Sequence, residues 1–144
     1  MIKTTYEEFL EKNGTMTYSN VGVSMMPLLK QGRDLFTVRK KGKERCKKYD
    51  VVLYRRPPSS YVLHRIIRVR DNDYVILGDN CVNREYGIKD SDIIGVMTEF
   101  VHNGRKHTVN EMGYRIYSHI MVGFAPVRVM FMRTKAKLKR LVRR

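Results

Sequence analysis

The feature that most constrains the fold is a pair of β-rich runs separated by a short polar turn. The longer run spans residues 61–69 (YVLHRIIRV) and the shorter one spans residues 74–77 (YVIL). β-Branched and aromatic side chains are enriched in strands, and the intervening Asp71-Asn72-Asp73 is typical of a turn. The two runs therefore predict a β-hairpin.

Further runs extend this pattern over residues 15–100. Residues 50–54 (DVVLY) and 93–97 (IIGVM) each read as a strand, and residues 57–60 (PPSS) predict a loop before the hairpin. Helical periodicity is weak throughout this region. We therefore expect a mainly β fold, as a small β-rich domain over residues 1–112 with its core at about 15–100.

Helices are expected at both ends of this domain. Thr5 and Glu8 fit a capping box, and Asn13-Gly14 is a helix stop signal, so the chain should begin with a short helix. Residues 113–144 are expected to form a basic amphipathic helical tail, because apolar residues recur at helical spacing from Val127 onward with Lys and Arg between them.

The charge predicts an anionic partner. The net charge is +15, and residues 133–144 carry seven basic side chains and no acidic one. For residues 127–144 we favour a helix on an anionic membrane surface. The alternatives are a solvated helix without a partner and, with less support, a nucleic-acid contact, since the tail lacks interleaved aromatic side chains.

The N-terminus and the cysteines suggest a location. The first fourteen residues do not resemble a secretory signal, and no uninterrupted apolar stretch of about 20 residues is present. Cys46 and Cys81 have no CxxC spacing and are expected to be free thiols. We therefore expect a cytoplasmic protein, or one peripheral on the inner face of the membrane.

Three polar residues could carry chemistry. Ser24 follows Gly22 and precedes Pro27, which predicts an exposed turn; it reads either as a turn serine or as a nucleophile. His64 lies on an otherwise apolar strand face, as a core histidine or as a general base. Asp79 reads as a turn aspartate or as the acid that orients the imidazole. Together they form the minimum set for acyl transfer.

Taken together, these segments resemble the type I signal peptidases and their relatives, the self-cleaving repressor peptidases. Four boxes occur in the family's order: a nucleophile box, a His-Arg strand, a Gly-Asp-Asn turn and a closing strand. These are residues 22–27 (GVSMMP), 62–67 (VLHRII), 78–80 (GDN) and 93–96 (IIGV). The His-Arg pair is similar to the archaeal, endoplasmic-reticulum and sporulation-type branch, which uses histidine as its base.

The resemblance implies a role for each matching residue. Ser24 would be the nucleophile, His64 the general base and Asp79 the third member of the catalytic set. Glu85 is a looser match to a second acid. Backbone N–H groups of Ser24 and Met25 would stabilise the oxyanion, and Met25 would line the substrate floor. No metal or cofactor is implied.

The expected function is that of a serine endopeptidase of signal-peptidase type, acting on a peptide or protein substrate such as a leader or membrane-proximal peptide. Two other classes stay open. One is a catalytically inactive relative that binds peptides in the same cleft. The other is a basic membrane-binding or nucleic-acid-binding module, for which the β domain is only a scaffold.

Overall fold

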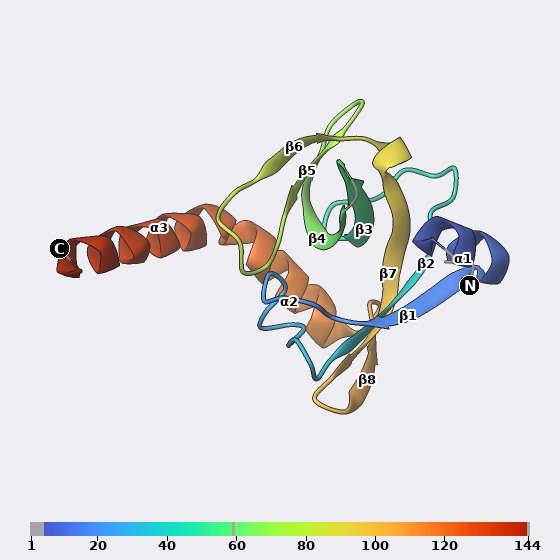
Figure 1. The fold of residues 1–144 in the computed structure, drawn as a ribbon, viewed down its shortest axis with the longest axis horizontal. Helices are drawn as coiled ribbons and strands as arrows, with labels where there is room; N and C mark the ends of the chain where they lie inside the picture. The colour runs from blue at the N-terminus through green and yellow to red at the C-terminus, as the bar shows by residue number, and fades with distance from the viewer. Residues whose placement is uncertain (1–4, 59, 144) are drawn as a thin grey trace.

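The computed structural model describes residues 5–58 and 60–143 of the 144-residue chain. Eight strands form one antiparallel, strongly twisted sheet in the order β1-β2-β7-β3-β4-β5-β6, with β8 paired to β7 (Figure 1). The mainly β prediction is confirmed. The elements are α1 (Tyr6–Asn13), β1 (Thr15–Ser19), β2 (Leu35–Lys40), β3 (Val51–Arg56), β4 (Ser60–Val69), β5 (Tyr74–Leu77), β6 (Glu85–Ile88), β7 (Ile93–His102), β8 (Arg105–Thr108), α2 (Met112–Gly123) and α3 (Ala125–Val142).

The predicted hairpin is present as β4 and β5. Arg65 pairs with Leu77, and Val69 pairs with Tyr74, around a register shift between Ile66 and Arg68. On its other side β4 pairs with β3, which places His64 opposite Val52 in the centre of the sheet. The strand that carries the candidate base is thus paired along both edges and is held rigidly.

Some strands lie outside the runs singled out from the sequence. Strands β1, β6 and β8 are short, and most of their side chains are exposed or half-buried. Short strands with one solvated face carry little apolar signal. Their places in the sheet are set by pairing, as when β8 returns along β7 after the turn at Asn103 and Gly104.

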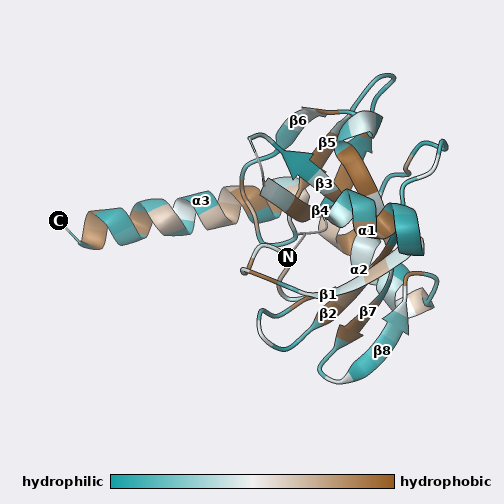
Figure 2. Ribbon diagram, turned by 45° about the vertical axis from the view of Figure 1, so that its right-hand side comes forward, coloured by the Kyte–Doolittle hydropathy of each residue, from teal (hydrophilic) through white to brown (hydrophobic). Residues whose placement is uncertain are grey.

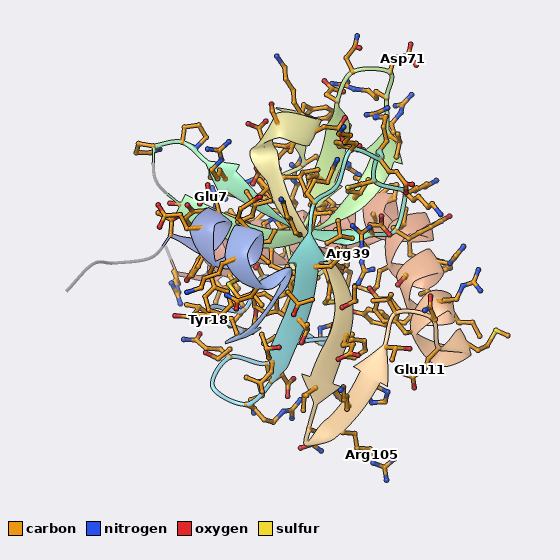
Figure 3. The ribbon with its side chains drawn as sticks, turned by 90° about the vertical axis from the view of Figure 1, so that its right-hand side faces the viewer. Glu7, Tyr18, Arg39, Asp71, Arg105 and Glu111 are labelled. Carbon is orange, nitrogen blue, oxygen red and sulfur yellow. The ribbon has the colours of Figure 1, made fainter. Side chains whose placement is uncertain are left out.

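Helix α1 begins as the sequence predicts. The Thr5 hydroxyl accepts from the backbone N–H of Glu8 at 3.1 Å, and the Glu8 carboxylate accepts from the Thr5 N–H at 3.3 Å. Gly14 ends the helix in the left-handed region, at a φ of 80°. Glu7 of this helix and Tyr18 of β1 lie on the same side of the molecule (Figure 3), where Tyr6 packs edge-on against Tyr18.

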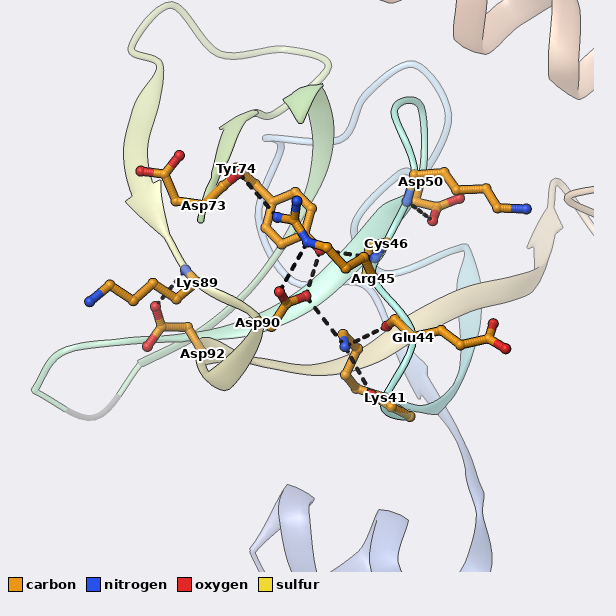
Figure 4. Close-up of polar contacts among 12 residues, drawn as sticks. Lys41, Glu44, Arg45, Cys46, Asp50, Asp73, Tyr74, Lys89, Asp90 and Asp92 are labelled. Carbon is orange, nitrogen blue, oxygen red and sulfur yellow. Dashed lines mark hydrogen bonds and ion pairs between the residues drawn. The ribbon is translucent and has the colours of Figure 1, made fainter. Parts of the chain in front are cut away.

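The connection between β2 and β3 is held by Asp90 from the turn before β7 (Figure 4). The Asp90 carboxylate accepts from Arg45 Nε at 3.2 Å and from the Tyr74 hydroxyl, and Lys41 Nζ lies 3.4 Å away. The Tyr74 hydroxyl in turn accepts from the backbone N–H of Cys46 at 2.9 Å. These contacts fix the loop that leads into β3.

The C-terminal region forms two helices, separated at Phe124. Helix α2 packs on the sheet, with Tyr114 and Tyr117 against the larger hydrophobic core and Ser118 buried. The start of α3 covers Leu77 with Ala125 and Val129, and the rest of α3 projects away from the sheet (Figure 1). Within residues 5–58 and 60–143, no helix is both long and apolar enough to cross a bilayer.

Candidate active site

Ser24 lies in a tight turn within the connection between β1 and β2. Gly22 adopts a φ of 83°, a left-handed conformation that favours glycine. The N–H of Met26 donates to the carbonyl of Val23 at 3.1 Å, which closes the turn around Ser24. The N–H groups of Ser24 and Met25 donate to no acceptor among the described residues.

The far end of this connection is anchored by Asp34, which is fully buried. Its carboxylate accepts from the backbone N–H of Lys30 at 2.8 Å and of Asn103 at 3.0 Å, and from Arg33 Nε at 2.8 Å. The hydrogen bond from Arg33 is the largest cause that holds the pKa of Asp34 well below its usual range, with the two backbone bonds assisting. A charged, fully bonded carboxylate thus fixes the loop that presents Ser24.

His64 lies on β4, and its side chain is almost fully buried, with 6% exposed. Burial lowers the pKa of the imidazole to about 4; the charge of Arg56 lowers it further, and Asp79 acts in the opposite direction. Nδ1 lies 3.3 Å from the Tyr54 hydroxyl. At neutral pH the ring is therefore uncharged, and a proton on Nδ1 that donates to Tyr54 leaves Nε2 free as a base.

Gly78 marks the point at which the candidate residues converge. A Cβ on this glycine would lie 2.8 Å from the Ser24 carbonyl oxygen, 2.9 Å from His64 Nε2 and 2.6 Å from Cys81 Sγ. Only a glycine leaves room for these three atoms. The neighbouring Asn80 donates from its backbone N–H to the Ser24 carbonyl at 2.8 Å, and so ties the two loops together.

Ser24 and His64 line one cleft with a volume of about 850 Å³. Its walls come from α1, from strands β1 to β4 and from the loop after Gly78, and Met132 of α3 closes part of it. Aromatic and aliphatic side chains make up much of the lining: Tyr6, Met16, Tyr18, Val21, Phe36, Leu53, Tyr61, Val62, Leu63 and Val82. A largely apolar cleft with a few convergent polar groups is typical of a binding site.

Asp79 lies next to this cleft, but its carboxylate faces away from His64. Its two oxygens accept from Arg65 Nε at 2.8 Å and Nη2 at 2.9 Å, and Oδ2 also accepts from the Tyr117 hydroxyl at 2.8 Å. Both side chains of this ion pair are 1% exposed. The group at the imidazole Nδ1 is Tyr54, where the family resemblance implied Asp79.

The two remaining sequence candidates differ in position. Glu85 lines the edge of the cleft, where its carboxylate pairs with Arg56. Met25 is fully buried in the hydrophobic core beneath the turn and does not line the cleft. The apolar lining of the cleft is therefore built by other side chains, such as Leu53 and Leu63.

Sequence reasoning did not single out four residues around the site. Tyr54 and Arg56 follow one another at alternate positions of β3, a strand pattern that could have placed them on the face of His64. Cys81 Sγ lies 3.9 Å from His64 Nε2, and burial raises the pKa of this thiol. Arg128 of α3 donates to the Asp79 backbone carbonyl, a contact between distant segments for which the sequence carries no signal.

Comparison of the chain with protein-family models, with curated proteins and with solved structures gives no match. Among the residues that the structure describes, no group of three or more His, Cys, Asp or Glu side chains is arranged to hold a metal ion. Both cysteines are free thiols.

Proposed function

We propose that this protein is a serine endopeptidase of the signal-peptidase type, with Ser24 as nucleophile and His64 as general base. The observation that carries the proposal is the convergence at Gly78, where the Ser24 backbone and His64 Nε2 meet in one cleft. The four sequence boxes, which occur in the order of the signal-peptidase family, add support. Two of these boxes supply the serine turn and the buried, uncharged imidazole that line the cleft.

The geometry suggests how the reaction would proceed. His64 Nε2 takes the proton from Ser24 Oγ as the oxygen attacks the scissile carbonyl, and it then gives that proton to the leaving amine. The N–H of Ser24, which lines the cleft and has no acceptor among the described residues, stabilises the oxyanion. Water activated by the same imidazole hydrolyses the acyl-enzyme. In this mechanism Nδ1 carries the ring proton and donates it to the Tyr54 hydroxyl, 3.3 Å away.

The cleft favours an extended, mainly apolar peptide as substrate. Its lining offers many aromatic and aliphatic side chains, and the charged pair of Arg56 and Glu85 lies at one edge. A leader peptide or a membrane-proximal segment of a protein fits this lining better than a charged peptide does, because apolar side chains gain most from burial there.

The test is to incubate the purified chain with a library of unstructured peptides and to identify products by mass spectrometry. The wild type should cleave, and Ser24→Ala and His64→Gln should each be inactive while they keep their fold. Ser19→Ala is the matched control, because Ser19 lines the same cleft. Cleavage by Ser24→Ala at the wild-type rate would refute the proposal.

A second control concerns the thiol in the cleft. Cys81 Sγ lies 3.9 Å from His64 Nε2, which makes this thiol a second candidate nucleophile. Because burial raises the pKa of this thiol, little reactive thiolate is present at neutral pH. Cys81→Ala should therefore keep most of the activity. Loss of cleavage in Cys81→Ala, together with activity in Ser24→Ala, would assign the chemistry to the cysteine.

A further inference from the structure

Helix α3 carries a stripe of large apolar side chains that face solvent. These side chains recur three, four or seven positions apart, so they share one face of the helix. Their exposed fractions run from 58% for Val127 to 86% for Val142. The outer stripe, as we call it, consists of Val127, Met130, Phe131, Leu138, Leu141 and Val142. Bands of apolar and polar residues alternate along α3 in Figure 2.

The outer stripe cannot be covered by the protein's own sheet. The opposite face of α3 already makes the contacts with the domain, through Ala125 and Val129 in a small core and Met132 at the cleft. The stripe therefore points away from the rest of the molecule. Exposed apolar surface of this extent is unusual for a soluble monomer and marks a site of interaction.

A second run of exposed apolar side chains precedes the stripe on α2. Met112, Ile116 and Ile120 lie four positions apart, and each is at least half exposed. Phe124, which separates the two helices, is 62% exposed. Arg115 and His119 of α2 lie among these apolar side chains around a shallow depression. The apolar surface thus starts at Met112, well before residues 127–144, for which the sequence favoured a membrane surface.

The charges beside the stripe define the partner. Residues 112–144 contain no Asp or Glu, while α3 carries basic side chains on both flanks of the stripe. At 3.6 residues per turn, Lys135 and Lys139 fall on one flank. Lys137 and Arg140 fall on the other, while Arg128 and Arg133 donate to backbone carbonyls of the loop after Gly78. An apolar stripe between two basic flanks is the pattern of a helix that lies in the interface of an anionic bilayer.

We propose that the outer face of α2 and α3 docks on an anionic lipid bilayer, with the apolar stripe in the headgroup region and the basic flanks against lipid phosphates. Two other partners fit less well. A second copy of the chain would bring two strongly basic helices together, and nucleic acid would leave the apolar stripe without a partner. This proposal does not depend on the peptidase activity.

The chain contains no tryptophan, so a single substitution supplies a reporter. Phe131→Trp places an indole in the centre of the stripe, and Tyr86→Trp places one at an exposed position on β6 as the matched control. Each full-length protein is mixed with vesicles of phosphatidylcholine alone or with one third phosphatidylglycerol. We expect a blue shift and quenching by brominated lipid for Phe131→Trp with anionic vesicles only.

Co-sedimentation with the same vesicles separates the apolar and electrostatic contributions. Phe131→Gln with Leu138→Gln should weaken binding at least tenfold, because two apolar side chains no longer enter the interface. Tyr86→Gln with Val69→Gln changes exposed apolar residues elsewhere and should have no effect. Ser24→Ala should bind as the wild type does, so that loss of peptidase activity and loss of docking are read separately.

Three results would overturn the proposal. The first is equal binding, or none, to neutral and anionic vesicles. The second is vesicle binding that the Phe131→Gln and Leu138→Gln pair leaves unchanged, which would mean that charge alone acts. The third is a concentration-dependent dimer, or a complex with duplex DNA, that this pair abolishes while vesicles do not bind at all.

Discussion

The buried ion pair between Arg65 and Asp79 allows a prediction with a magnitude. Asp79→Ala would leave the Arg65 guanidinium, which is 1% exposed, without its countercharge and without two hydrogen bonds of 2.8 and 2.9 Å. Neutral partners such as Tyr114 and Ser118 remain, at 3.1 and 2.9 Å, and cannot balance the charge. Breaking a buried pair in this way costs about 3–5 kcal/mol.

The assay is urea unfolding, supported by thermal melts. A loss of this size should lower the melting temperature by roughly 10 °C for a domain of this length. The matched control is Asp73→Ala, because Asp73 forms a similar paired contact with Arg70 on the surface, where solvent screens it. The control should leave the melting temperature nearly unchanged.

The double variant Arg65→Leu with Asp79→Leu sharpens the test. It removes both charges, so it should be less destabilised than Asp79→Ala, because no unpaired charge stays buried. The reasoning is refuted if Asp79→Ala unfolds at the wild-type urea concentration. A folded Asp79→Asn that loses peptide cleavage by about 10⁴-fold would instead restore Asp79 as the residue that orients the base.

Three further predictions concern the base and its surroundings. His64 has a pKa of about 4 in the folded chain, below its unfolded value near 6.5. As the pH falls, the unfolded state binds this proton at a higher pH than the folded state does. The free energy of unfolding of the wild type should therefore fall between pH 7 and 5 by about 2 kcal/mol more than that of His64→Gln. The acid limb of the kcat/KM profile should lie near pH 4. Tyr54→Phe should lower kcat about fivefold to tenfold with little change in KM, since it removes the hydrogen bond to Nδ1; an unchanged kcat would contradict this role. Gly78→Ala should cost about 1–3 kcal/mol of stability and about 100-fold in cleavage, because its methyl group would displace His64 and the Ser24 turn, whereas Gly42→Ala, with open space around it, should do neither.

The sequence predicted the elements with strong local signals. The capping box at Thr5 and Glu8, the β4–β5 hairpin and the start of β7 all carry their pattern within a few residues, and the structure confirms them. The short strands were not singled out, and the single helical tail expected over residues 113–144 is divided into α2 and α3 at Phe124. Their formation depends on partners far along the chain, such as the contacts of Tyr114 and Ser118 with Arg65.

In the candidate site, too, the residues with local motifs were predicted and the contacts between distant segments were not. Ser24 and His64, which the sequence singled out, line one cleft, and their catalytic roles stay a prediction. The partner of the imidazole could not be predicted, because Asp79 and Tyr54 are both compatible with the strand pattern, and only the packing of α2 decides that Arg65 takes the carboxylate. A buried arginine next to a histidine in the sequence is a sign that a nearby acid has a structural partner.

The position of α3 changes what a truncation of this chain means. Ala125 and Val129 cover Leu77 at the end of β5, and Arg128 and Arg133 donate to backbone carbonyls in the loop that follows it. A protein shortened to remove its positive charge would therefore lose the brace of that loop as well. Helix α3 thus carries both the positive charge and the contacts that hold the cleft loop. Only point substitutions on the outer side of α3 can remove the charge and keep those contacts.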